Sequence, residues 1–536
     1  MIQINELRLP IDHVPQALEQ AILHRLQLAP EELIRFEIFK RSVDARKNVE
    51  LTLTYTVHVS VKDESAVLSK WSFDPQVRPA PDTRYHFVAK APELFDQRPV
   101  VICFGPCGLF AALVLAQMGF KPIVLERGKA VRERTQDTWG LWRRNTLNPE
   151  SNVQFGEGGA GLFSDGKLYS QIKDPQFLGR KVIAEFIKAG APAEIQYVAK
   201  PHIGTFRLVG VVEKMREEII ALGGEVRFSS KVTEFLINNG QLEGLKLEDG
   251  QTIATQRAIL ALGHSSRDTF TALHQAKVYL EQKPFSVGFR IEHPQSIIDR
   301  ARLGPHAGNP IVGAADYKLV HHAKNGRSVY SFCMCPGGTV VAATSEPNRV
   351  VTNGMSQYSR NERNANAAIV VGISPEDYPG GPLAGIEFQR ELESKAFIMG
   401  GSNYEAPGSL VGDFLKGQVS QEFRTVLPSY KPGVHLTDLT QALPHYAIEA
   451  IQEAIPHFDK KIAGFSMNDA IFTGVETRTS APLRISRGLD FQSLNVRGLY
   501  PAGEGAGYAG GILSAGVDGI KVAQAVAIDM MQNVSN

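Results

Sequence analysis

The sequence predicts an α/β fold built around a dinucleotide-binding domain, and three stretches of the chain carry that prediction. Residues 100–126 show the pattern of a strand, a glycine-rich turn, a helix and a second strand. Residues 224–263 hold short strands separated by Asn-Gly and Asp-Gly turns, which is the pattern of a β-meander. Residues 498–525 return to a strand, a glycine-rich loop and a helix. Strands that alternate with helices in this way are typical of a parallel sheet.

The length of the chain, 536 residues, indicates more than one hydrophobic core. We expect residues 1–95 to form a small α+β domain, because an amphipathic helix is followed there by the alternating strand 49–61. Residues 96–278 and 466–536 are expected to form the two parts of the dinucleotide-binding domain. The compositionally mixed residues 279–465 then form an α+β substrate or cap domain, inserted between those two parts.

The composition argues against several classes of function. Lys and Arg total 57 and Asp and Glu total 56, so no net charge draws the chain to nucleic acid or to an anionic membrane. The first residues lack the apolar run of a secretory signal, and two glycines and a proline interrupt the longest apolar stretch, residues 100–118. We therefore expect a cytoplasmic enzyme with no membrane partner.

Only four cysteines occur in the chain, Cys103, Cys107, Cys333 and Cys335. They are too few for a disulfide scaffold, and the two pairs lack the ligand number and spacing of a structural zinc site. We expect reduced thiols and no metal site.

The turn after the first predicted strand of the dinucleotide-binding domain carries the main motif, C-x-G-x-x-G. Gly105 and Gly108 stand where a pyrophosphate must approach backbone N–H groups at the start of a helix. Cys103 takes the position of the usual first glycine, where a side chain could crowd the phosphates. Pro106 and Cys107 lie between the glycines and are expected to contact the same ligand.

An acidic residue about 20 positions beyond the turn is the next test of a dinucleotide site. Glu126 meets it at the end of the second strand, in IVLERG, with Arg127 beside it. A carboxylate there accepts hydrogen bonds from the ribose hydroxyls of the adenosine half. Further contacts with the cofactor are expected at Val232 and Gly263, at the start and end of the meander.

The far end of the chain favours FAD over NAD. In GLYPAGEGAGYAGGIL, Gly503 and Glu504 follow a strand, and a helix opens near Gly510, Gly511 and Ile512. In flavoproteins an acidic residue at this place bonds the ribityl chain, and the helix N-terminus faces the N1 and O2 edge of the flavin. Because NAD-only enzymes have no use for this second contact, we predict bound FAD.

A third glycine-rich run, FGEGGAGLFSDGKL, contains Gly158, Gly159 and Gly161. It lacks a flanking strand and helix of adequate length, so we expect a loop along the FAD pyrophosphate and flavin rather than a nicotinamide site. With no other nucleotide fingerprint in the chain, a tightly held NADPH is disfavoured, and NAD(P)H stays open as a transient electron donor.

Together these segments resemble the bacterial FAD-dependent dehydrogenases known as NAD(FAD)-utilising dehydrogenases, a family without an assigned physiological reaction. The resemblance runs from the dinucleotide-binding domain to the C-terminus, through seven polar motifs. They are GPCGLFAAL, FGEGGAGLFSDGKL, KPHIGT, LGHSSRDTF, VGFRIEHPQ, SFCMCPGG and GVETRTSAPLRI. The resemblance implies a glutathione-reductase-like FAD-binding Rossmann domain with a cap domain, but no substrate. The family pattern also places glycine at position 103, where this chain has Cys103.

Candidate catalytic residues each carry an alternative that the sequence leaves open. Cys333 and Cys335 could exchange electrons with a flavin, or could be two small core residues on one face of a strand. His202 and His264 lie near glycines and could act as general acids, or could be structural residues of their loops.

A polar run before the final segment holds Glu476, Arg478 and Arg484. An arginine in this run could clamp a carboxylate or phosphate of the substrate. The alternative is a salt-bridged interface between the cap domain and the FAD domain.

We expect an FAD-dependent oxidoreductase that acts on a small molecule, with redox chemistry at the flavin N5. A second hypothesis is a flavoprotein that docks RNA or a protein through its N-terminal domain, at the basic cluster Lys40, Arg41, Arg46 and Lys47. A solvated turn is the alternative interpretation of that cluster, favoured by the acidic residues that balance the unit. A third hypothesis is a flavin-bearing sensor or structural protein without turnover.

Overall fold

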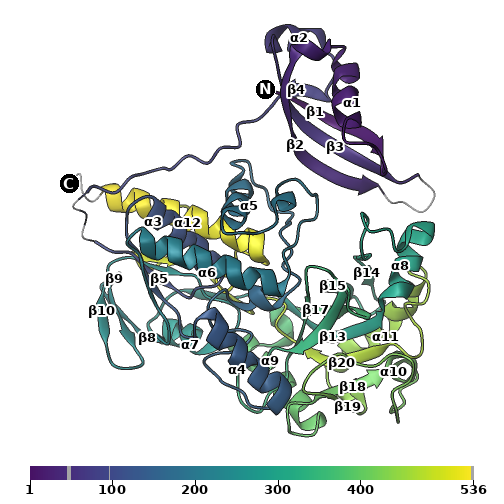
Figure 1. Ribbon diagram of the computed structural model, residues 1–536. Helices are drawn as coiled ribbons and strands as arrows, with labels where there is room; N and C mark the ends of the chain where they lie inside the picture. The colour runs from purple at the N-terminus through teal and green to yellow at the C-terminus, as the bar shows by residue number, and fades with distance from the viewer. Residues whose placement is uncertain (45–49, 94, 96, 533–536) are drawn as a thin grey trace.

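The computed structural model describes residues 1–44, 50–93, 95 and 97–532 of the chain. Three parts are visible in Figure 1: a small N-terminal domain, a parallel-sheet domain with helices α3, α6 and α12, and a domain built on a large, mostly antiparallel sheet. The fold is therefore a mixed α/β fold with parallel and antiparallel sheets.

The N-terminal domain is a four-stranded antiparallel sheet whose buried face packs against two helices. Its order β-α-β-β-α-β and its sheet order β2-β3-β1-β4 are those of the ferredoxin-like arrangement. In β3, Val57 and Val59 face the helices, whereas Thr54 and Thr56 face away from them. The elements are β1 (Ile2–Pro10), α1 (Ala17–Leu26), β2 (Leu33–Asp44), β3 (Thr52–Val61), α2 (Glu64–Lys70) and β4 (Val77–Pro79).

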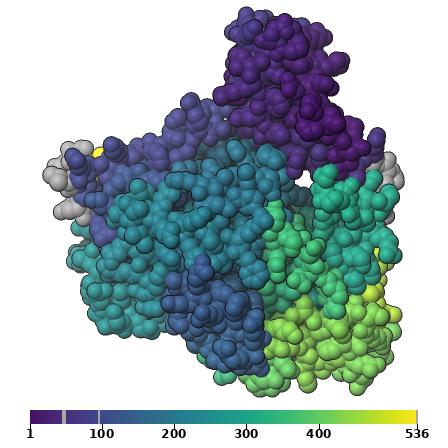
Figure 2. Space-filling model, in the orientation of Figure 1, coloured from purple at the N-terminus to yellow at the C-terminus, as the bar shows by residue number. Residues whose placement is uncertain are grey.

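Strand β2 docks this domain on the rest of the molecule. Arg41 N donates to Tyr197 O at 2.7 Å, and Ala199 N donates to Arg41 O at 2.9 Å. Beside this short bridge, the guanidinium of Arg180 lies 3.8 Å from the ring centroid of Phe39. The edge strand of the small sheet is thus partly paired by the body of the protein. Figure 2 shows the domain projecting from that body.

The central sheet has five parallel strands in the order β22-β11-β5-β6-β7. Strands β6 and β7 lie on one side of β5, and the later strands β11 and β22 lie on the other side. The strand order therefore reverses between β5 and β11. Ligands of open α/β sheets bind at such a reversal, beyond the carboxyl ends of the strands. The strands are β5 (Val100–Ile102), β6 (Ile123–Leu125), β7 (Glu225–Arg227), β11 (Ala258–Leu260) and β22 (Leu499–Pro501).

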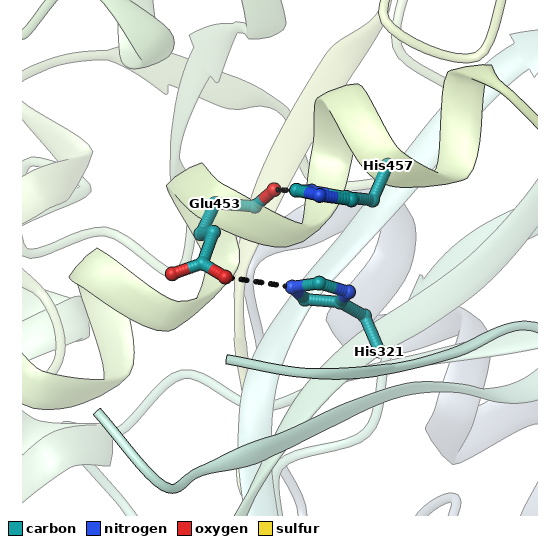
Figure 3. Close-up of side chains that lie close together, drawn as sticks. All are labelled: His321, Glu453 and His457. Atoms are coloured by element: carbon teal, nitrogen blue, oxygen red, sulfur yellow. Dashed lines mark hydrogen bonds and ion pairs between the residues drawn. The ribbon is translucent and has the colours of Figure 1, made fainter. Parts of the chain in front are cut away.

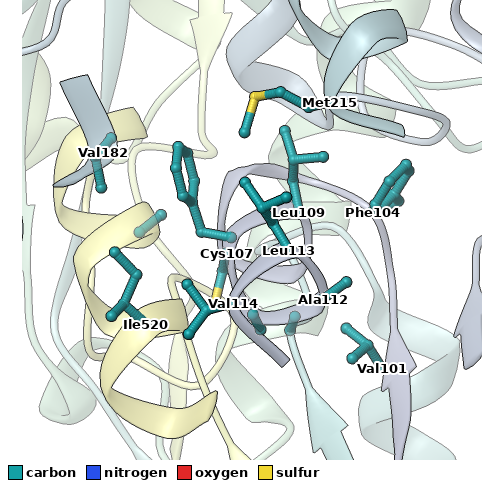
Figure 4. Close-up of a cluster of buried hydrophobic side chains, with 14 of the residues drawn as sticks. Val101, Phe104, Cys107, Leu109, Ala112, Leu113, Val114, Val182, Met215 and Ile520 are labelled. Carbon is teal, nitrogen blue, oxygen red and sulfur yellow. The ribbon is translucent and has the colours of Figure 1, made fainter. Parts of the chain in front are cut away.

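Helix α3 (Pro106–Gln117) forms the centre of the core of this domain (Figure 4). Its residues 107–116 are all buried, as expected of a helix that is apolar on every side. It packs against β5 and β6 and against helices α6 and α12. Small residues let α12 approach closely, since an added Cβ on Gly519 would stand 2.2 Å from the backbone oxygen of Cys107.

The other helices of this domain are α4 (Val131–Arg144), α5 (Leu178–Lys188), α6 (Thr205–Ala221), α7 (Arg267–Gln275) and α12 (Ile512–Gln532). The meander predicted for residues 224–263 is also present, as a three-stranded sheet of β8 (Val232–Asn238), β9 (Gln241–Leu247) and β10 (Thr252–Ala254). Asn239 and Gly240 both have positive φ at its first turn, as a tight hairpin requires. Among the described residues, no helix has the length and apolar character needed to cross a bilayer.

The inserted domain is built on an eight-stranded sheet of order β14-β15-β17-β13-β20-β18-β19, with β16 beside β15. Its strands are β13 (Phe285–Pro294), β14 (Val320–His322), β15 (Ser328–Ala342), β16 (Thr352–Ser356), β17 (Asn364–Ile373), β18 (Ala406–Leu410), β19 (Val434–Leu436) and β20 (Ile471–Glu476). Its helices are α8 (Gln295–Leu303), α9 (Ala384–Met399), α10 (Val411–Leu415) and α11 (His445–Asp459).

Strand β20 lies inside this antiparallel sheet, paired with β13 and β18. The sequence boundary at residue 466 assigned it instead to the dinucleotide-binding domain, because a short buried strand does not reveal its partners. Two further strands, β12 (Leu280–Gln282) and β21 (Leu483–Ile485), pair with each other where the chain enters and leaves the inserted domain.

Candidate functional site

The turn after β5 is as tight as its motif predicts. Cys103 adopts φ +77°, in the left-handed region that favours glycine. An added Cβ on Gly108 would stand 2.0 Å from the backbone oxygen of Cys103, so the third position of the motif must be glycine. The Cys103 side chain is accommodated, but its backbone is in the conformation for which the usual glycine is suited.

Glu126 organises this turn. One of its carboxylate oxygens accepts from Phe104 N at 2.7 Å, and the other accepts from Gly128 N at 2.8 Å and Gly156 N at 3.0 Å. The residue is buried, with 3% of its surface exposed. A carboxylate has about four acceptor sites, so three of them hold the surrounding backbone. The carboxylate thus joins the turn after β5, the end of β6 and the glycine-rich loop.

Arg127, the neighbour of Glu126, is engaged in ion pairs. Its guanidinium bonds Glu150 at 2.8 Å and Asp268 at 2.7 Å and lies 4.0 Å from the ring centroid of Phe155. This residue therefore braces the loop after β6. Val232 is buried at the start of β8 and presents no polar side chain to a ligand.

The third glycine-rich run forms a loop that contacts two helix starts. Gly158 N donates to Phe104 O at 2.9 Å. A Cβ on Gly159 would stand 2.8 Å from the Cα of Gly105, and one on Gly161 would stand 2.9 Å from the Ile512 side chain. The loop therefore lies against both the turn before α3 and the first residue of α12.

The loop before α12 is fixed to the same place. Gly503 N donates to Asp518 at 2.8 Å, and a Cβ on Gly503 would stand 2.9 Å from the Cβ of Cys107 in α3. A cavity of about 350 Å³ opens where α12 begins, lined by residues 507–511 and by Tyr169. The three glycine-rich segments of the sequence thus converge at the N-termini of α3 and α12.

Four glycines at this junction have room for a side chain in the structure. Among the described residues, an added Cβ would meet nothing within 4 Å at Gly263 or Gly510 and one atom at 4.0 Å at Gly511. At Gly105 it would meet only another glycine Cα, at 3.5 Å. None of the four has positive φ, so neither backbone strain nor internal packing requires glycine there. Open backbone at two helix starts is the arrangement that a dinucleotide phosphate needs, and the residues present fit that group.

Glu504 and His264 lie side by side at this junction, with Glu504 Oε1 and His264 Nε2 4.0 Å apart. Burial and the nearby guanidinium of Arg478 lower the pKa of His264 to about 3. Burial raises the pKa of Glu504 to about 7, although the ammonium of Lys283 partly offsets it. At neutral pH the imidazole is uncharged, which argues against a general-acid role for His264. Of the two groups, the Glu504 carboxyl is the one that holds or releases a proton near neutral pH.

Arg478 belongs to a buried ion cluster between the two larger domains. Arg478 and Arg267 both form two hydrogen bonds to the carboxylate of Glu393, at 2.7 to 3.0 Å. Burial opposes the charge of Glu393, but the two guanidinium groups outweigh it and hold the pKa of this carboxyl well below its usual range. Arg478 also donates to Ser265 at 3.0 Å. Of the two roles considered for this arginine, the structure has the salt-bridged interface.

Glu476 forms a second buried ion pair, with Arg290, at 2.8 and 2.9 Å. Arg290 also donates to Cys333 O at 2.8 Å. Cys333 has φ +42° and is exposed, whereas Cys335 is buried, because β15 has irregular register on both sides of Cys335. The expectation that the two thiols share one strand face is therefore wrong. Burial raises the pKa of the Cys335 thiol, so this thiol is not a ready nucleophile.

His202 lies near these cysteines through Lys167. The two residues form an isolated bridge, and Lys167 Nζ donates to Met334 O, between the cysteines. The His202 ring stacks on Tyr358 with its centroid 5.1 Å away, and burial lowers the pKa of His202. The packing matches the structural alternative for this histidine.

The six predicted catalytic residues thus lie along one seam between the inserted domain and the parallel-sheet domain. Five charged residues described along that seam are not predicted from the sequence: Lys167, Arg267, Lys283, Arg290 and Glu393. Lys167, Arg267 and Arg290 lie inside the motifs that carry the family resemblance. Lys283 and Glu393 have no local signal, because their partners are distant in the chain.

The basic cluster of the N-terminal domain is only partly described. Lys40 lines a polar cavity of about 430 Å³ on the sheet, with Arg78 and Glu6. Arg41 is used in docking, since its guanidinium lies 5.1 Å from the Tyr197 ring centroid. Arg46 and Lys47 lie outside the described residues. The contacts of Arg41 reduce the basic surface that this cluster can offer to RNA.

Two family models match parts of the chain. Residues 284–479 match "FAD-dependent protein, C-terminal domain-like", and residues 1–60 match a domain of unknown function, DUF8436. The first match coincides with the inserted domain and ends just after Arg478.

Solved structures with low similarity to this chain include three enzymes. Glycine oxidase from Bacillus cereus ATCC 14579 is 10% identical, with 81% of this chain and 96% of that chain covered and a TM-score of 0.31. L-proline dehydrogenase from P. horikoshii is 12% identical, with coverage of 81% and 94% and a TM-score of 0.32. The flavin-dependent brominase Bmp2 is 10% identical, with coverage of 81% and 79% and a TM-score of 0.38.

A curated relative is far more similar. An uncharacterized protein of Clostridium beijerinckii (strain ATCC 51743 / NCIMB 8052) is 50% identical over 525 residues, which cover 98% of each chain. The chain therefore belongs to the same family as this Clostridium beijerinckii protein, and its inserted domain is similar to the C-terminal domain of FAD-dependent proteins.

Proposed function

We propose that this protein is an FAD-dependent oxidoreductase acting on a small molecule. The observation that carries the proposal is the convergence of three glycine-rich segments at the N-termini of α3 and α12, with open space at four glycines. The match of residues 284–479 to an FAD-dependent family supports it from a different part of the chain.

The residues that would hold the cofactor fall into two groups. The turn with Gly105, Pro106 and Gly108, ordered by Glu126, would take the adenosine diphosphate half. Gly510, Gly511 and Ile512 at the start of α12 would face the flavin half, where the helix N-terminus favours negative charge. Gly158, Gly159 and Gly161 form the loop between them. FAD, when bound, supplies the acceptance and return of two electrons at N5 of its ring.

The chain's own contribution to chemistry is expected beside Glu504. With a pKa of about 7, its carboxyl can hold or release a proton near neutral pH, which suits a general acid or base. His264, uncharged, lies beside it and can accept a hydrogen bond. Lys283 is half-buried nearby, where desolvation lowers its pKa. We propose this trio, rather than His202 or the two cysteines, as the polar side of the substrate site.

The buried ion cluster of Arg267, Glu393 and Arg478 positions this trio. Arg478 holds Ser265, the neighbour of His264, and comes from the inserted domain. Arg478 therefore links the inserted domain to the loop that holds His264. A small movement of the inserted domain would shift the position of His264.

Purified protein tests the proposal directly. We expect a flavin absorption spectrum, and release of FAD rather than FMN on denaturation. Anaerobic stopped-flow mixing with NADH, NADPH and a panel of metabolites then identifies the electron donor, including whether NAD(P)H serves as a transient one. Protein that carries no flavin and takes up no FAD would contradict the proposal. A flavin that no donor reduces would instead favour a sensor without turnover.

A further inference from the structure

Outside the cofactor region, two histidines and a glutamate gather at one edge of the inserted domain (Figure 3). His321 comes from the edge strand β14, and Glu453 and His457 come from α11. His321 Nε2 lies 2.9 Å from Glu453 Oε1. One donor atom of each side chain lies within 4.8 Å of the other two.

We propose that His321, Glu453 and His457 form a zinc site that joins α11 to β14. Two imidazole nitrogens and one carboxylate oxygen are a donor set that Zn²⁺ uses in proteins, with water as a fourth ligand. Glu453 and His457 are four residues apart in one helix, so both side chains lie on the face that packs against β14.

The surroundings prepare the side chains for a metal ion. His457 Nδ1 lies 2.8 Å from Glu453 O, so with the proton on Nδ1 the other ring nitrogen keeps a free lone pair. A hydrogen bond from the second ring nitrogen to a backbone carbonyl is the usual support of a metal-bound histidine. The second oxygen of Glu453 accepts from Lys324 N at 3.1 Å, which fixes the carboxylate.

Zinc binding needs a small local adjustment. Donor atoms at about 2.0 to 2.1 Å from a tetrahedral ion are about 3.4 Å apart. The donor atoms of His321, Glu453 and His457, which lie within 4.8 Å of one another, must therefore move closer together. The two rings are stacked, with centroids 4.1 Å apart and planes at 22°. The nitrogen lone pairs therefore lie in nearly parallel planes and do not converge on one point. One ring must therefore turn as the ion replaces the proton shared by His321 and Glu453. The side chains of these two residues are 16% and 24% exposed, which leaves access for the fourth, water ligand.

The site is separate from the cofactor region. In Figure 1, β14 and α11 lie on the opposite side of the molecule from α12. The ion would hold the hairpin edge of the large sheet to the helix that covers it, a structural rather than a catalytic role. The proposal does not depend on flavin chemistry, so it stands or fails independently of the proposed function.

The test is Zn²⁺ titration of the full-length protein after chelator treatment, with Co²⁺ as a spectroscopic substitute. We expect one equivalent of Zn²⁺ and the visible bands of four-coordinate Co²⁺. His321→Asn, Glu453→Gln and His457→Gln should each weaken Zn²⁺ binding by at least about tenfold. The matched control is His322→Asn, one position along β14, whose ring bonds Ser328 instead. That variant should bind like the wild type.

Several outcomes would overturn the site. If the wild-type protein binds no Zn²⁺ at micromolar concentration, His321 and Glu453 form only a hydrogen-bonded pair and the zinc site does not exist. Equal binding by the wild type and the three variants would place the ion elsewhere. A sulfur-to-cobalt charge-transfer band would assign it to the cysteines. Far-ultraviolet circular dichroism in EDTA checks that each variant is folded.

Discussion

Gly159 lies so close to Gly105 that a Cβ on Gly159 would stand 2.8 Å from the Cα of Gly105. The glycine-rich loop and the turn before α3 are therefore in backbone contact at the proposed cofactor site. A Cβ on Gly105, by contrast, would stand 3.5 Å from the Cα of Gly159, which is an ordinary van der Waals contact. The two glycines consequently lend themselves to different experiments.

Gly105→Ala should leave the protein folded and remove most of its bound FAD. The new methyl group fits the backbone, whose φ is −75°, but occupies the path by which a phosphate approaches the helix start. We expect at least a tenfold loss of FAD affinity, measured by reconstitution of the flavin-free protein.

Gly210→Ala is the control for that variant. Gly210 lies in α6, and an added Cβ there meets none of the described residues within 4 Å. This substitution should keep the FAD affinity and raise stability by about 0.5 to 1 kcal/mol, as alanine does inside helices. Equal FAD affinity in both variants would mean that the phosphate does not bind at Gly105.

Cys103→Gly should stabilise the protein and tighten FAD retention. The left-handed conformation at φ +77° costs a non-glycine residue about 1 to 2 kcal/mol. Glycine removes that strain but gains about 0.5 to 1 kcal/mol of unfolded-state entropy. We expect a net gain of up to about 1 kcal/mol in urea unfolding and slower FAD release on dilution. Cys107→Ala, in the first turn of α3 at negative φ, should produce no such gain.

Glu504 should make the flavin-free protein less stable as the pH rises from about 4.5 to 7. Its folded pKa of about 7 exceeds the ordinary value of 4.5, so over this range the folded state holds a proton that the unfolded state has lost. The contribution is complete below pH 4.5 and disappears above pH 7, with a total of at most about 3 kcal/mol. Urea unfolding at pH 5 and pH 7.5 measures it.

Glu504→Gln should flatten that part of the pH dependence, because the amide does not titrate. Glu391→Gln, an exposed position of α9, should leave the wild-type slope in place. If Glu504→Gln keeps the full slope, another group holds the proton.

Glu393→Gln should destabilise the protein strongly. The carboxylate is fully buried between two buried guanidinium groups, and its loss leaves the charges of Arg267 and Arg478 to be balanced by the single carboxylate of Glu346. Removal of one partner from a buried ion cluster costs about 3 to 5 kcal/mol. Thermal unfolding and urea unfolding should both report the loss.

Glu387→Gln tests the same chemistry at the surface of the same helix. Glu387 pairs with Arg390 at 2.7 Å, but its side chain is 69% exposed. The expected cost is under about 1 kcal/mol, as for other surface pairs. Similar losses in both variants would mean that burial does not set the strength of the cluster.

The parts of the site that depend on backbone geometry were predictable from the sequence. A turn that brings a helix start near a phosphate needs glycine at fixed spacing, and that need is visible in Gly105 and Gly108 without any knowledge of the fold. The same holds for the loop at Gly158 and for the start of α12 at Gly511. A requirement on the backbone of a few neighbouring residues is visible as a short motif in the sequence.

The charged seam was not predictable in the same way. Glu393 lies 126 positions from Arg267 and 85 from Arg478, and no periodicity marks such partners. The separate surroundings of Cys333 and Cys335 depend on a strand irregularity that alternation cannot reveal. The cluster of His321, Glu453 and His457 likewise appears only when α11 covers β14.

The short ribbon of β12 and β21 bears on how this architecture arose. Leu280 faces Ile485 and Gln282 faces Leu483, so both ends of the inserted domain leave the parallel-sheet domain as neighbours. Adjacent strands lie about 5 Å apart, a separation that a few linker residues can span. The chain thus enters and leaves the inserted domain through one two-stranded ribbon. Exchange of this domain between relatives would have to match both that ribbon and the buried cluster of Arg267, Glu393 and Arg478.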